Sequence, residues 1–310
     1  MCHSLVGSEM CIRDSDNQTL AYGLIKLRDM GVPVVGTIHH PITMDKRIDI
    51  KHAETLSLKL LKWRWYSFLK MQIKVARKLD PIIVVSENTR KDVVKDFKID
   101  PKKTRKVLHG IDHKTFEPIP SIKRKKNQLI TTASADVPLK GLIYLIRAYS
   151  ELLNEFPDLS LVVIGKLRDG PTSNELDKKD IKNKVKFISD LTSREIAELY
   201  AESTIAISPS VYEGFGFPAG EAMSCGIPLI STNGGSLPEV VGDSGIIVPH
   251  SNPNELRKAI KELLLSPEKR KELGEKGRKR VLEKFTWKRA AKELVEVYRE
   301  AISNADNRSR

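Results

Sequence analysis

The sequence predicts an α/β protein in which two halves of the chain each build a parallel sheet covered by helices. Short apolar segments of strand length alternate with longer segments whose apolar residues recur at helical spacing, and this alternation is typical of parallel sheets. The chain has 310 residues, which is enough for two domains with separate cores. Its hydrophobic content of 40% and aromatic content of 6% fit the same class.

The first half is marked by two short apolar strands, each followed by polar residues. Leu20, Leu24 and Leu27 recur at helical spacing, and Gly31 ends that helix. Ser86 has a side chain that favours the N-cap of the next helix. The expected elements are a helix over 19–30, a strand over 32–38, a basic helical segment over 53–79 and a strand over 82–85.

A linker is predicted over 117–127, where two prolines and a run of basic residues interrupt the periodicity. Strands and helices alternate after it. The expected strands span 129–133, 160–164, 185–188, 204–207, 228–230 and 245–248. The expected helices span 141–156, 193–202, 218–225, 253–265, 267–283 and 287–302.

The first fifteen residues have no periodicity, and they lack the apolar core of a secretory signal. They resemble a translated sequencing-adaptor fragment, so we expect 1–15 to be non-native and leave them out of the fold prediction. The remaining chain divides into a first domain over 16–116, the linker over 117–127, a second domain over 128–285, a closing helix over 286–302 and a polar tail over 303–310.

The net charge of +13 indicates an acidic partner, which could be nucleic acid, an anionic membrane or a phosphorylated substrate. Nucleic acid is not expected, because the basic residues are spread along the helices and no known nucleic-acid motif is present. Cys2, Cys11 and Cys225 form no C-x-x-C pair, which argues against zinc and disulfides and favours a reducing compartment. No apolar run reaches the roughly 18 residues that span a bilayer.

The segment 59–74 mixes aromatic residues with lysine and arginine. Trp63, Trp65 and Tyr66 lie among cations, a mixture that occurs on helices at membrane surfaces. The same pattern fits an aromatic stripe in the core with a solvated basic face. Peripheral contact with an anionic membrane and burial in the core both stay open.

The stretch over 208–235, SPSVYEGFGFPAGEAMSCGIPLISTNGG, carries the most chemical information. Glu213 and Glu221 are separated by a glycine-rich turn, in which Gly214 and Gly216 allow the backbone to approach a ligand. Pro218 suits the first position of a helix, and the N–H groups at a helix start attract phosphate. This stretch therefore predicts a site for a phosphorylated ligand.

An ordered set of motifs around this stretch resembles the donor-sugar site of glycosyltransferase family 4, a group of retaining enzymes with the GT-B fold. The resemblance covers roughly residues 16–302. The motifs are Lys140-Gly141, a strand ending at Gly165, VKFIS at 185–189, PSVYEGFGFP, EAMSCGIP, Asn233-Gly234-Gly235 and Leu237-Pro238-Glu239. VLHGID resembles another family element, with His109 where Asn is usual.

The resemblance implies two Rossmann-like domains with parallel sheets. The N-terminal one, on the acceptor side, is expected to be incomplete, because the usual first strand and glycine-rich loop are not found. Residues 128–285 would bind the nucleotide sugar, and the last helix would cross back to the first domain. The implied activity is retaining transfer of a hexose from a UDP-, GDP- or ADP-linked donor to a glycan or lipid-linked acceptor, in cell envelope or exopolysaccharide synthesis. The implied location is the cytoplasm, or the inner face of the membrane as a peripheral protein.

The resemblance also implies site residues. Glu213 and His39 would be catalytic, with His40 as a neighbour that could share the role of His39. The donor-binding residues would be Lys140, Gly214, Phe215, Gly216 and Glu221. The four remaining histidines of the native part, His52, His109, His113 and His250, are expected to be structural or on the surface. The nucleotide sugar is a substrate, and no cofactor is expected.

Two positions depart from the family. Ala135 stands where an arginine is common, and the usual N-terminal histidine falls at Ser15. No metal is expected, because the fold generally uses none and the only D-x-D spans 14–16.

Two other functions stay open. One is a different GT-B enzyme, such as a nucleotide-sugar epimerase or a glycogen-type synthase. The other is a nucleotide-sugar-binding remnant that is inactive through truncation.

Overall fold

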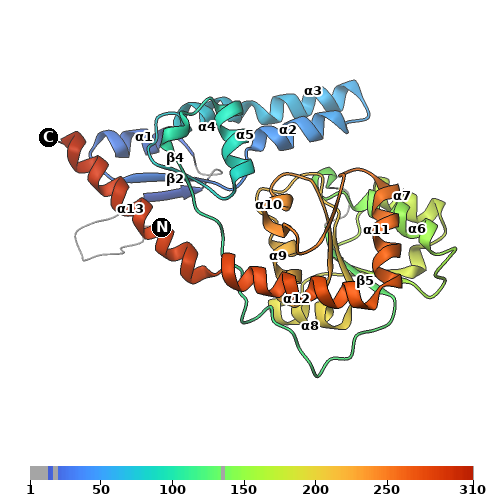
Figure 1. The fold of residues 1–310 in the computed structure, drawn as a ribbon. Helices are drawn as coiled ribbons and strands as arrows, with labels where there is room; N and C mark the ends of the chain where they lie inside the picture. Colours follow the sequence, from blue (N-terminus) through green and yellow to red (C-terminus); the bar gives the residue numbers. More distant parts are fainter. Residues whose placement is uncertain (1–12, 17–19, 134–136, 310) are drawn as a thin grey trace. The chain divides into compact units, whose positions relative to one another are not determined.

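The computed structural model describes residues 13–16, 20–133 and 137–309 (Figure 1). These residues fall into two compact units. Unit 1 comprises the described residues up to His109 and those from Lys288 onward, and unit 2 comprises the described residues between Gly110 and Trp287. The segment 117–127, for which we predicted a linker, belongs to unit 2.

Unit 1 is built on a parallel sheet with the strand order β1-β2-β3-β4. Its strands are β1 (Arg13–Asp16), β2 (Val34–Ile38), β3 (Ile82–Val84) and β4 (Thr104–Lys106). In register, Arg13 is opposite Val34, Gly36 is opposite Ile82, and Ile82 is opposite Thr104. The helices of unit 1 are α1 (Tyr22–Asp29), α2 (Ile42–Lys51), α3 (Leu56–Trp65), α4 (Leu69–Ala76), α5 (Glu87–Phe97) and α13 (Trp287–Ser309).

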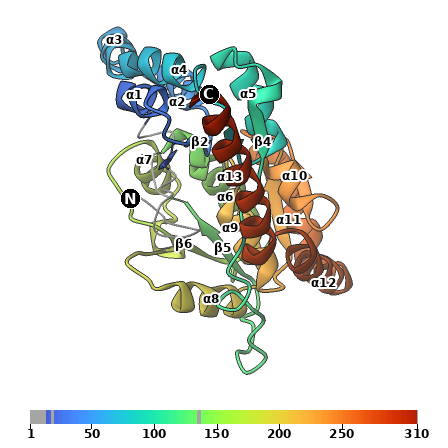
Figure 2. The same cartoon turned by 90° about the vertical axis from the view of Figure 1, so that its left-hand side faces the viewer.

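The two faces of this sheet bury different helices. One face packs with α1, α4 and α5 in a core that includes Leu24, Val75 and Phe97. The other face packs with α13 (Figure 2). Val297 and Tyr298 of this helix share a buried cluster with Val35 and Ile83 of the sheet. Alternate residues of a strand face opposite sides of its sheet, so both faces are apolar and both are covered.

Three features of unit 1 differ from the sequence prediction. β1 includes residues that we left out of the fold prediction, and it pairs with β2. The helical segment 53–79 is broken at a 3₁₀ turn over Tyr66–Phe68, where the buried Tyr66 donates a hydrogen bond of 2.8 Å to Asp49 of α2. The predicted polar tail is helical as far as Ser309, because Ala305 is buried and extends the apolar face of α13.

Unit 2 has a six-stranded parallel sheet with the order β10-β9-β8-β5-β6-β7. Its strands are β5 (Gln128–Thr132), β6 (Ser160–Ile164), β7 (Val185–Ile188), β8 (Ile205–Ser208), β9 (Leu229–Thr232) and β10 (Ile246–Val248). Its helices are α6 (Leu142–Leu152), α7 (Pro171–Lys178), α8 (Ser193–Glu202), α9 (Phe217–Ser224), α10 (Leu237–Val241), α11 (Pro253–Leu265) and α12 (Pro267–Lys284). All the strands and helices predicted for 128–285 are present, and α7 and α10 are additional.

The strand order of unit 2 reverses at β5, which pairs with β6 on one side and with β8 on the other. Chain connections leave such a reversal point in opposite directions, so a crevice forms at the carboxyl ends of these two strands. Residues that follow β5 and β8 therefore meet at this edge. Among the described helices, none has both the length and the apolar character needed to cross a bilayer.

Candidate functional site

The loops that follow β5 and β8 approach each other closely at Gly141. This residue follows the 3₁₀ turn Pro138–Lys140 and has φ +62°. A Cβ atom here would lie 2.2 Å from the carbonyl oxygen of Pro209, so only glycine fits. The backbone N–H of Val211 donates to the carbonyl oxygen of Leu139 at 2.7 Å, which ties the two loops together.

This approach brings Lys140 and Glu213 into an ion pair. The Nζ atom of Lys140 lies 2.8 Å from Oε1 of Glu213, and the hydroxyl of Ser210 donates to the same oxygen at 2.7 Å. The Glu213 side chain is 13% exposed, whereas that of Lys140 is 33% exposed. The carboxylate is thus held by two groups, and the more exposed lysine can reach a ligand.

The turn over 233–236 contacts the backbone carbonyl of Glu213. Gly235 has φ +61°, and a Cβ atom on it would lie 2.2 Å from the carbonyl oxygen of Glu213. That oxygen accepts hydrogen bonds from the Ser236 backbone N–H at 2.9 Å and from its hydroxyl at 3.0 Å. The Ser236 hydroxyl also lies 2.8 Å from the carbonyl oxygen of Phe215. The family motif Asn-Gly-Gly therefore shapes the turn that carries Glu213.

The glycine-rich turn leads directly into α9. Gly216 precedes the helix with φ +98°, and Pro218 is its second residue, one place later than predicted. Proline is tolerated at either place, because N–H groups in the first turn have no partner within the helix. Phe215 is buried against the rings of Phe217 and Phe285. Its ring therefore belongs to the core, and only its backbone can contact a ligand.

Glu221 lies about one turn into α9, in apolar surroundings. Burial raises the pKa of its carboxyl from 4.5 to about 7. The neighbouring Tyr200 is buried, and its pKa is raised by burial and by the charge of Glu221. Among the described residues, none donates a hydrogen bond to the Glu221 carboxylate. A half-buried carboxylate without a hydrogen-bond donor gains from a ligand that supplies hydroxyl donors.

In unit 1, two histidines pair where β2 and β4 end. Nδ1 of His39 lies 3.1 Å from Nε2 of His109, and their rings stack with centroids 5.2 Å apart. Burial and the nearby His39 lower the pKa of His109 to about 4. We expected His109 to be structural or on the surface, yet it contacts a predicted catalytic residue. His40 instead pairs with Asp45 of α2 at 2.8 Å.

The structure therefore brings Lys140, Glu213, the 214–216 turn and Glu221 together in unit 2, and it places His39 in unit 1. Ala135 lies outside the described residues. The sequence analysis did not include three residues that contact the predicted site residues: Ser210, Ser236 and His109. The Asn-Gly-Gly motif could have indicated Ser236, and the departure from the family element could have indicated His109. Within the described ranges, no three His, Cys, Asp or Glu side chains are grouped as a metal site.

Comparison with known families decides the class of protein. The profile of "Glycosyl transferases group 1" matches residues 114–280, and that of "Glycosyltransferase Family 4" matches residues 15–115. The chain belongs to the group 1 glycosyl transferases. The predicted family resemblance is thereby confirmed.

Two curated relatives illustrate the range of this glycosyltransferase family. The chain is 39% identical over 292 residues to the MMP alpha-(1->4)-mannosyltransferase of Mycolicibacterium hassiacum. This match covers 93% of the chain and 70% of the relative. It is 29% identical over 243 residues to a D-inositol 3-phosphate glycosyltransferase of Streptomyces bingchenggensis. This match covers 72% of the chain and 53% of the relative. The chain thus spans little more than half the length of the second relative.

Solved structures confirm the GT-B fold. Sucrose-phosphate synthase of Thermosynechococcus elongatus superimposes with a TM-score of 0.78 at 21% identity, covering 94% of this chain and 74% of that one. HepE of Anabaena, crystallised with UDP-glucose, gives a TM-score of 0.70 at 17% identity. The match covers 94% of this chain and 77% of HepE. At these identities the likeness concerns the fold alone.

Replacing Glu221 by glutamine should stabilise the protein at high pH. The unfolded chain loses the Glu221 proton near pH 4.5 and the folded chain near pH 7, so the folded state loses stability as the pH rises through this window. Glu221→Gln stays neutral, and its free energy of unfolding at pH 8 should exceed that of the wild type by up to about 3 kcal/mol. At pH 5 the difference should be small. Urea unfolding at both pH values measures it.

The exposed Glu268→Gln serves as the control and should show no such pH-dependent gain. If Glu221 only stabilised the start of α9, its replacement would lower stability at pH 8, and this result would contradict the functional assignment.

His109 should fix the position of the proton on His39. A His109 that stays neutral can accept at Nε2 whether or not His39 is protonated, so Nδ1 of His39 should carry the shared proton. Nitrogen-15 NMR of histidine-labelled protein should report the Nδ1–H form. In His109→Ala this preference should disappear, and in His109→Asn the amide oxygen should restore it. An unchanged His39 spectrum in His109→Ala would refute the assignment.

Proposed function

We propose that this chain is a retaining hexosyltransferase that uses a nucleotide-diphosphate sugar, with mannose as the sugar to test first. The observation that carries the proposal is the Lys140–Glu213 pair before the start of α9, with the half-buried Glu221 one turn into this helix. These groups supply a cation, a sugar-facing carboxylate and an acceptor for ribose hydroxyls. The mannosyltransferase from M. hassiacum, at 39% identity, supports the choice of sugar.

Lys140 and the start of α9 would bind the leaving diphosphate. Lys140 is the more exposed member of its ion pair, so it can turn toward a phosphate oxygen without losing Glu213 as a neighbour. The backbone of Gly214, Phe215 and Gly216 leads into α9, whose positive end favours negative charge. Groups fixed before reaction stabilise the charge that develops as the sugar–phosphate bond breaks.

Glu213 would lie against the sugar ring. Its carboxylate is held by Ser210 and Lys140, and its backbone is held by Ser236, so it cannot turn away from a bound sugar. A fixed carboxylate stabilises positive charge at the anomeric carbon of an oxocarbenium-like transition state. Glu221 would accept hydrogen bonds from the two ribose hydroxyls.

Retention follows if the acceptor attacks from the face that the diphosphate leaves. The acceptor oxygen forms a bond to the anomeric carbon, the bond from that carbon to the phosphate oxygen breaks, and the acceptor proton passes to the released diphosphate. His39 would contact the sugar or the acceptor, with His109 fixing its orientation. The acceptor would be a hydroxyl of a glycan or of a lipid-linked glycan, and the reaction would take place in the cytoplasm.

Calorimetric titration with UDP, GDP and ADP, and with their mannose and glucose forms, tests the donor site. One nucleotide class should bind, and Glu221→Ala should weaken its binding by about 1–3 kcal/mol through the loss of a charged hydrogen bond. Glu268→Ala, on the exposed surface of α12, is the control. Equal binding to Glu221→Ala would remove that residue from the site, and no binding to the folded protein would favour an inactive chain.

Product analysis tests the reaction. Incubation of the bound nucleotide sugar with glycan acceptors should give a glycoside of unchanged anomeric configuration, as read by proton NMR. An inverted product would exclude retention. Conversion of the nucleotide sugar without an acceptor would favour an epimerase instead.

We also propose that α3 rests on an anionic membrane surface. Leu56, Leu60 and Trp65 are 84%, 68% and 73% exposed, and no residue of this helix is buried. Lys59, Lys62 and Arg64 lie between the apolar residues, and the helix contains no acid. Tryptophan and leucine with interleaved cations suit the boundary between lipid headgroups and acyl chains. Pairing of two copies through α3 would place like charges together.

Sedimentation with vesicles tests this contact. Phosphatidylglycerol vesicles should bind the protein at low salt, whereas phosphatidylcholine vesicles should not. The double variant Leu60→Ser/Trp65→Ser should reduce binding at least about tenfold. The control Met30→Ser/Leu265→Ser, whose parent side chains are 77% and 64% exposed, should bind normally. Equal binding of both double variants would contradict the proposal.

A further inference from the structure

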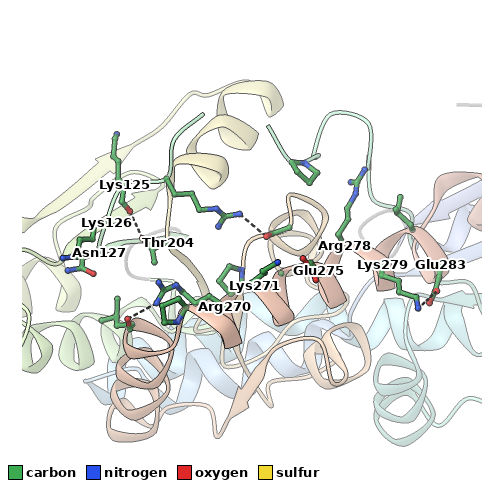
Figure 3. Close-up of a pocket in the computed structure, with 18 residues that line it drawn as sticks. Lys125, Lys126, Asn127, Thr204, Arg270, Lys271, Glu275, Arg278, Lys279 and Glu283 are labelled. Carbon is green, nitrogen blue, oxygen red and sulfur yellow. Dashed lines mark hydrogen bonds and ion pairs between the residues drawn. The ribbon is translucent and has the colours of Figure 1, made fainter. Parts of the chain in front are cut away.

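A large groove crosses unit 2 at the edge of the sheet opposite the candidate donor site. It has a volume of about 1140 Å³ and lies between the segment 124–127 and α12 (Figure 3). Asn127, Thr204 and Pro228 line its floor, and each directly precedes a strand: β5, β8 and β9 respectively. The donor-site residues follow the carboxyl ends of β5 and β8. The groove is therefore a separate site, and all its walls belong to one unit.

Three arginines of this groove are held in place without a carboxylate. Arg124 donates to the carbonyl oxygens of Ser203 and Gly226 at 3.2 and 3.1 Å. Arg270 donates to the last carbonyls of α11, and Arg278 donates to the carbonyl oxygens of His113, Phe116 and Ser224. Within the described part of the chain, no carboxylate lies within salt-bridge distance of these guanidinium groups. Carbonyl groups orient the arginines but leave their positive charge uncompensated.

These like charges also act on one another. Burial lowers the pKa of Arg124, and the positive charge of Arg270 lowers it further. Gly274 lets α12 approach the turn at Gly226 closely, since a Cβ atom on Gly274 would lie 2.4 Å from the Gly226 carbonyl oxygen. The fold thus holds guanidinium groups near one another on two facing walls. A bound anion would relieve the repulsion between them.

Four lysines extend the positive lining along the groove. Lys125 and Lys279 have carboxylate partners, Glu202 and Glu283. Lys126 and Lys271 have none among the described residues (Figure 3). The outer face of α12 differs, because there Lys276 is paired with Glu272 at 2.7 Å. On the groove side of this helix, Arg270, Lys271 and Arg278 have no carboxylate within salt-bridge distance among the described residues, and they outnumber the acids Glu275 and Glu283 that also line the groove.

The cations stand at two places along α12, and Gly274 lies between them. Arg270 and Lys271 form one group, and Arg278 and Lys279 form the other; eight residues of helix correspond to about 12 Å. A single phosphate or sulfate is too small to reach both groups. We infer that this groove binds an elongated polyanion that carries several phosphate or carboxylate groups along its length. The inference does not depend on the proposed transferase activity.

Binding of two defined polyanions tests the groove. The probes are linear polyphosphate and oligogalacturonate, which distinguish phosphate from carboxylate as the recognised group. Each titration is done with the donor site occupied by saturating nucleotide and repeated with Lys140→Gln, so that binding near Lys140 is not counted. At least one probe should bind, with an affinity that falls as the salt concentration rises.

The double variant Lys126→Gln/Lys271→Gln should weaken this binding about tenfold or more, because two direct ion contacts are lost. Neither lysine has a protein partner among the described residues, so the fold and nucleotide binding should be unchanged. The control Lys178→Gln/Lys179→Gln removes the same charge from exposed positions at the end of α7. Failure of both probes to bind would overturn the inference, as would equal losses in the two double variants, since the latter would indicate attraction by net charge alone.

Discussion

The site in unit 2 depends on how closely the backbone around Glu213 is enclosed. The loop after β8 is held on one side by Gly141, where the Pro209 carbonyl fills the space of a side chain, and on the other by Gly235, where the Glu213 carbonyl does the same. Ser236 completes the enclosure with two hydrogen bonds to that carbonyl. Both glycines also have positive φ, so any other residue would be strained twice over. The position of the Glu213 carboxylate follows from these backbone contacts more than from its own side-chain partners.

The two acids of the site are held in opposite electrostatic environments. Glu213 forms an ion pair with Lys140 and accepts a hydrogen bond from the hydroxyl of Ser210. Glu221 lies in apolar surroundings beside Tyr200, and burial opposes its ionisation. Carboxyl groups that lower the stability of the folded state are common at functional sites, because a ligand there can supply the hydrogen-bond donors that the protein lacks. The two carboxyl groups therefore differ in their surroundings, although they belong to one short stretch of sequence.

Most of unit 2 could be predicted from the sequence because its strands are largely apolar and its helices begin at clear capping residues. Thr192 and Asn252, for example, cap α8 and α11. α10 was missed because it is one short turn within a glycine-rich motif. β1 was missed because RDSD carries no apolar pattern and because residues 1–15 were left out of the fold prediction. Such a strand can be recognised only once its neighbour in the sheet is known.

The candidate site residues, like the strands and helices, could be predicted only where a local sequence pattern marks them. Lys140, Glu213 and Glu221 could be proposed because a motif fixes their spacing. Phe215 was proposed for its backbone N–H, and the burial of its ring leaves that proposal open. The contact of His109 with His39 joins residues that are seventy positions apart, and no local pattern reports it. Pairings across a sheet are set by topology, which sequence periodicity does not encode.

The pairing of cations with carboxylates differs between the candidate donor site, α3 and the basic groove beside α12. Within the described residues, Lys140 is balanced by Glu213 in the donor site, so that site adds little to the net charge of +13. Cations without a carboxylate partner among the described residues include Lys59 and Arg64 on α3 and the arginines of the groove beside α12. In the candidate donor site, the Glu213 carboxylate partly offsets the attraction of Lys140 for a diphosphate. Extended positive surfaces suit partners that bind through many weak contacts, and for these the fixed arginines of the groove offer orientation as well as charge.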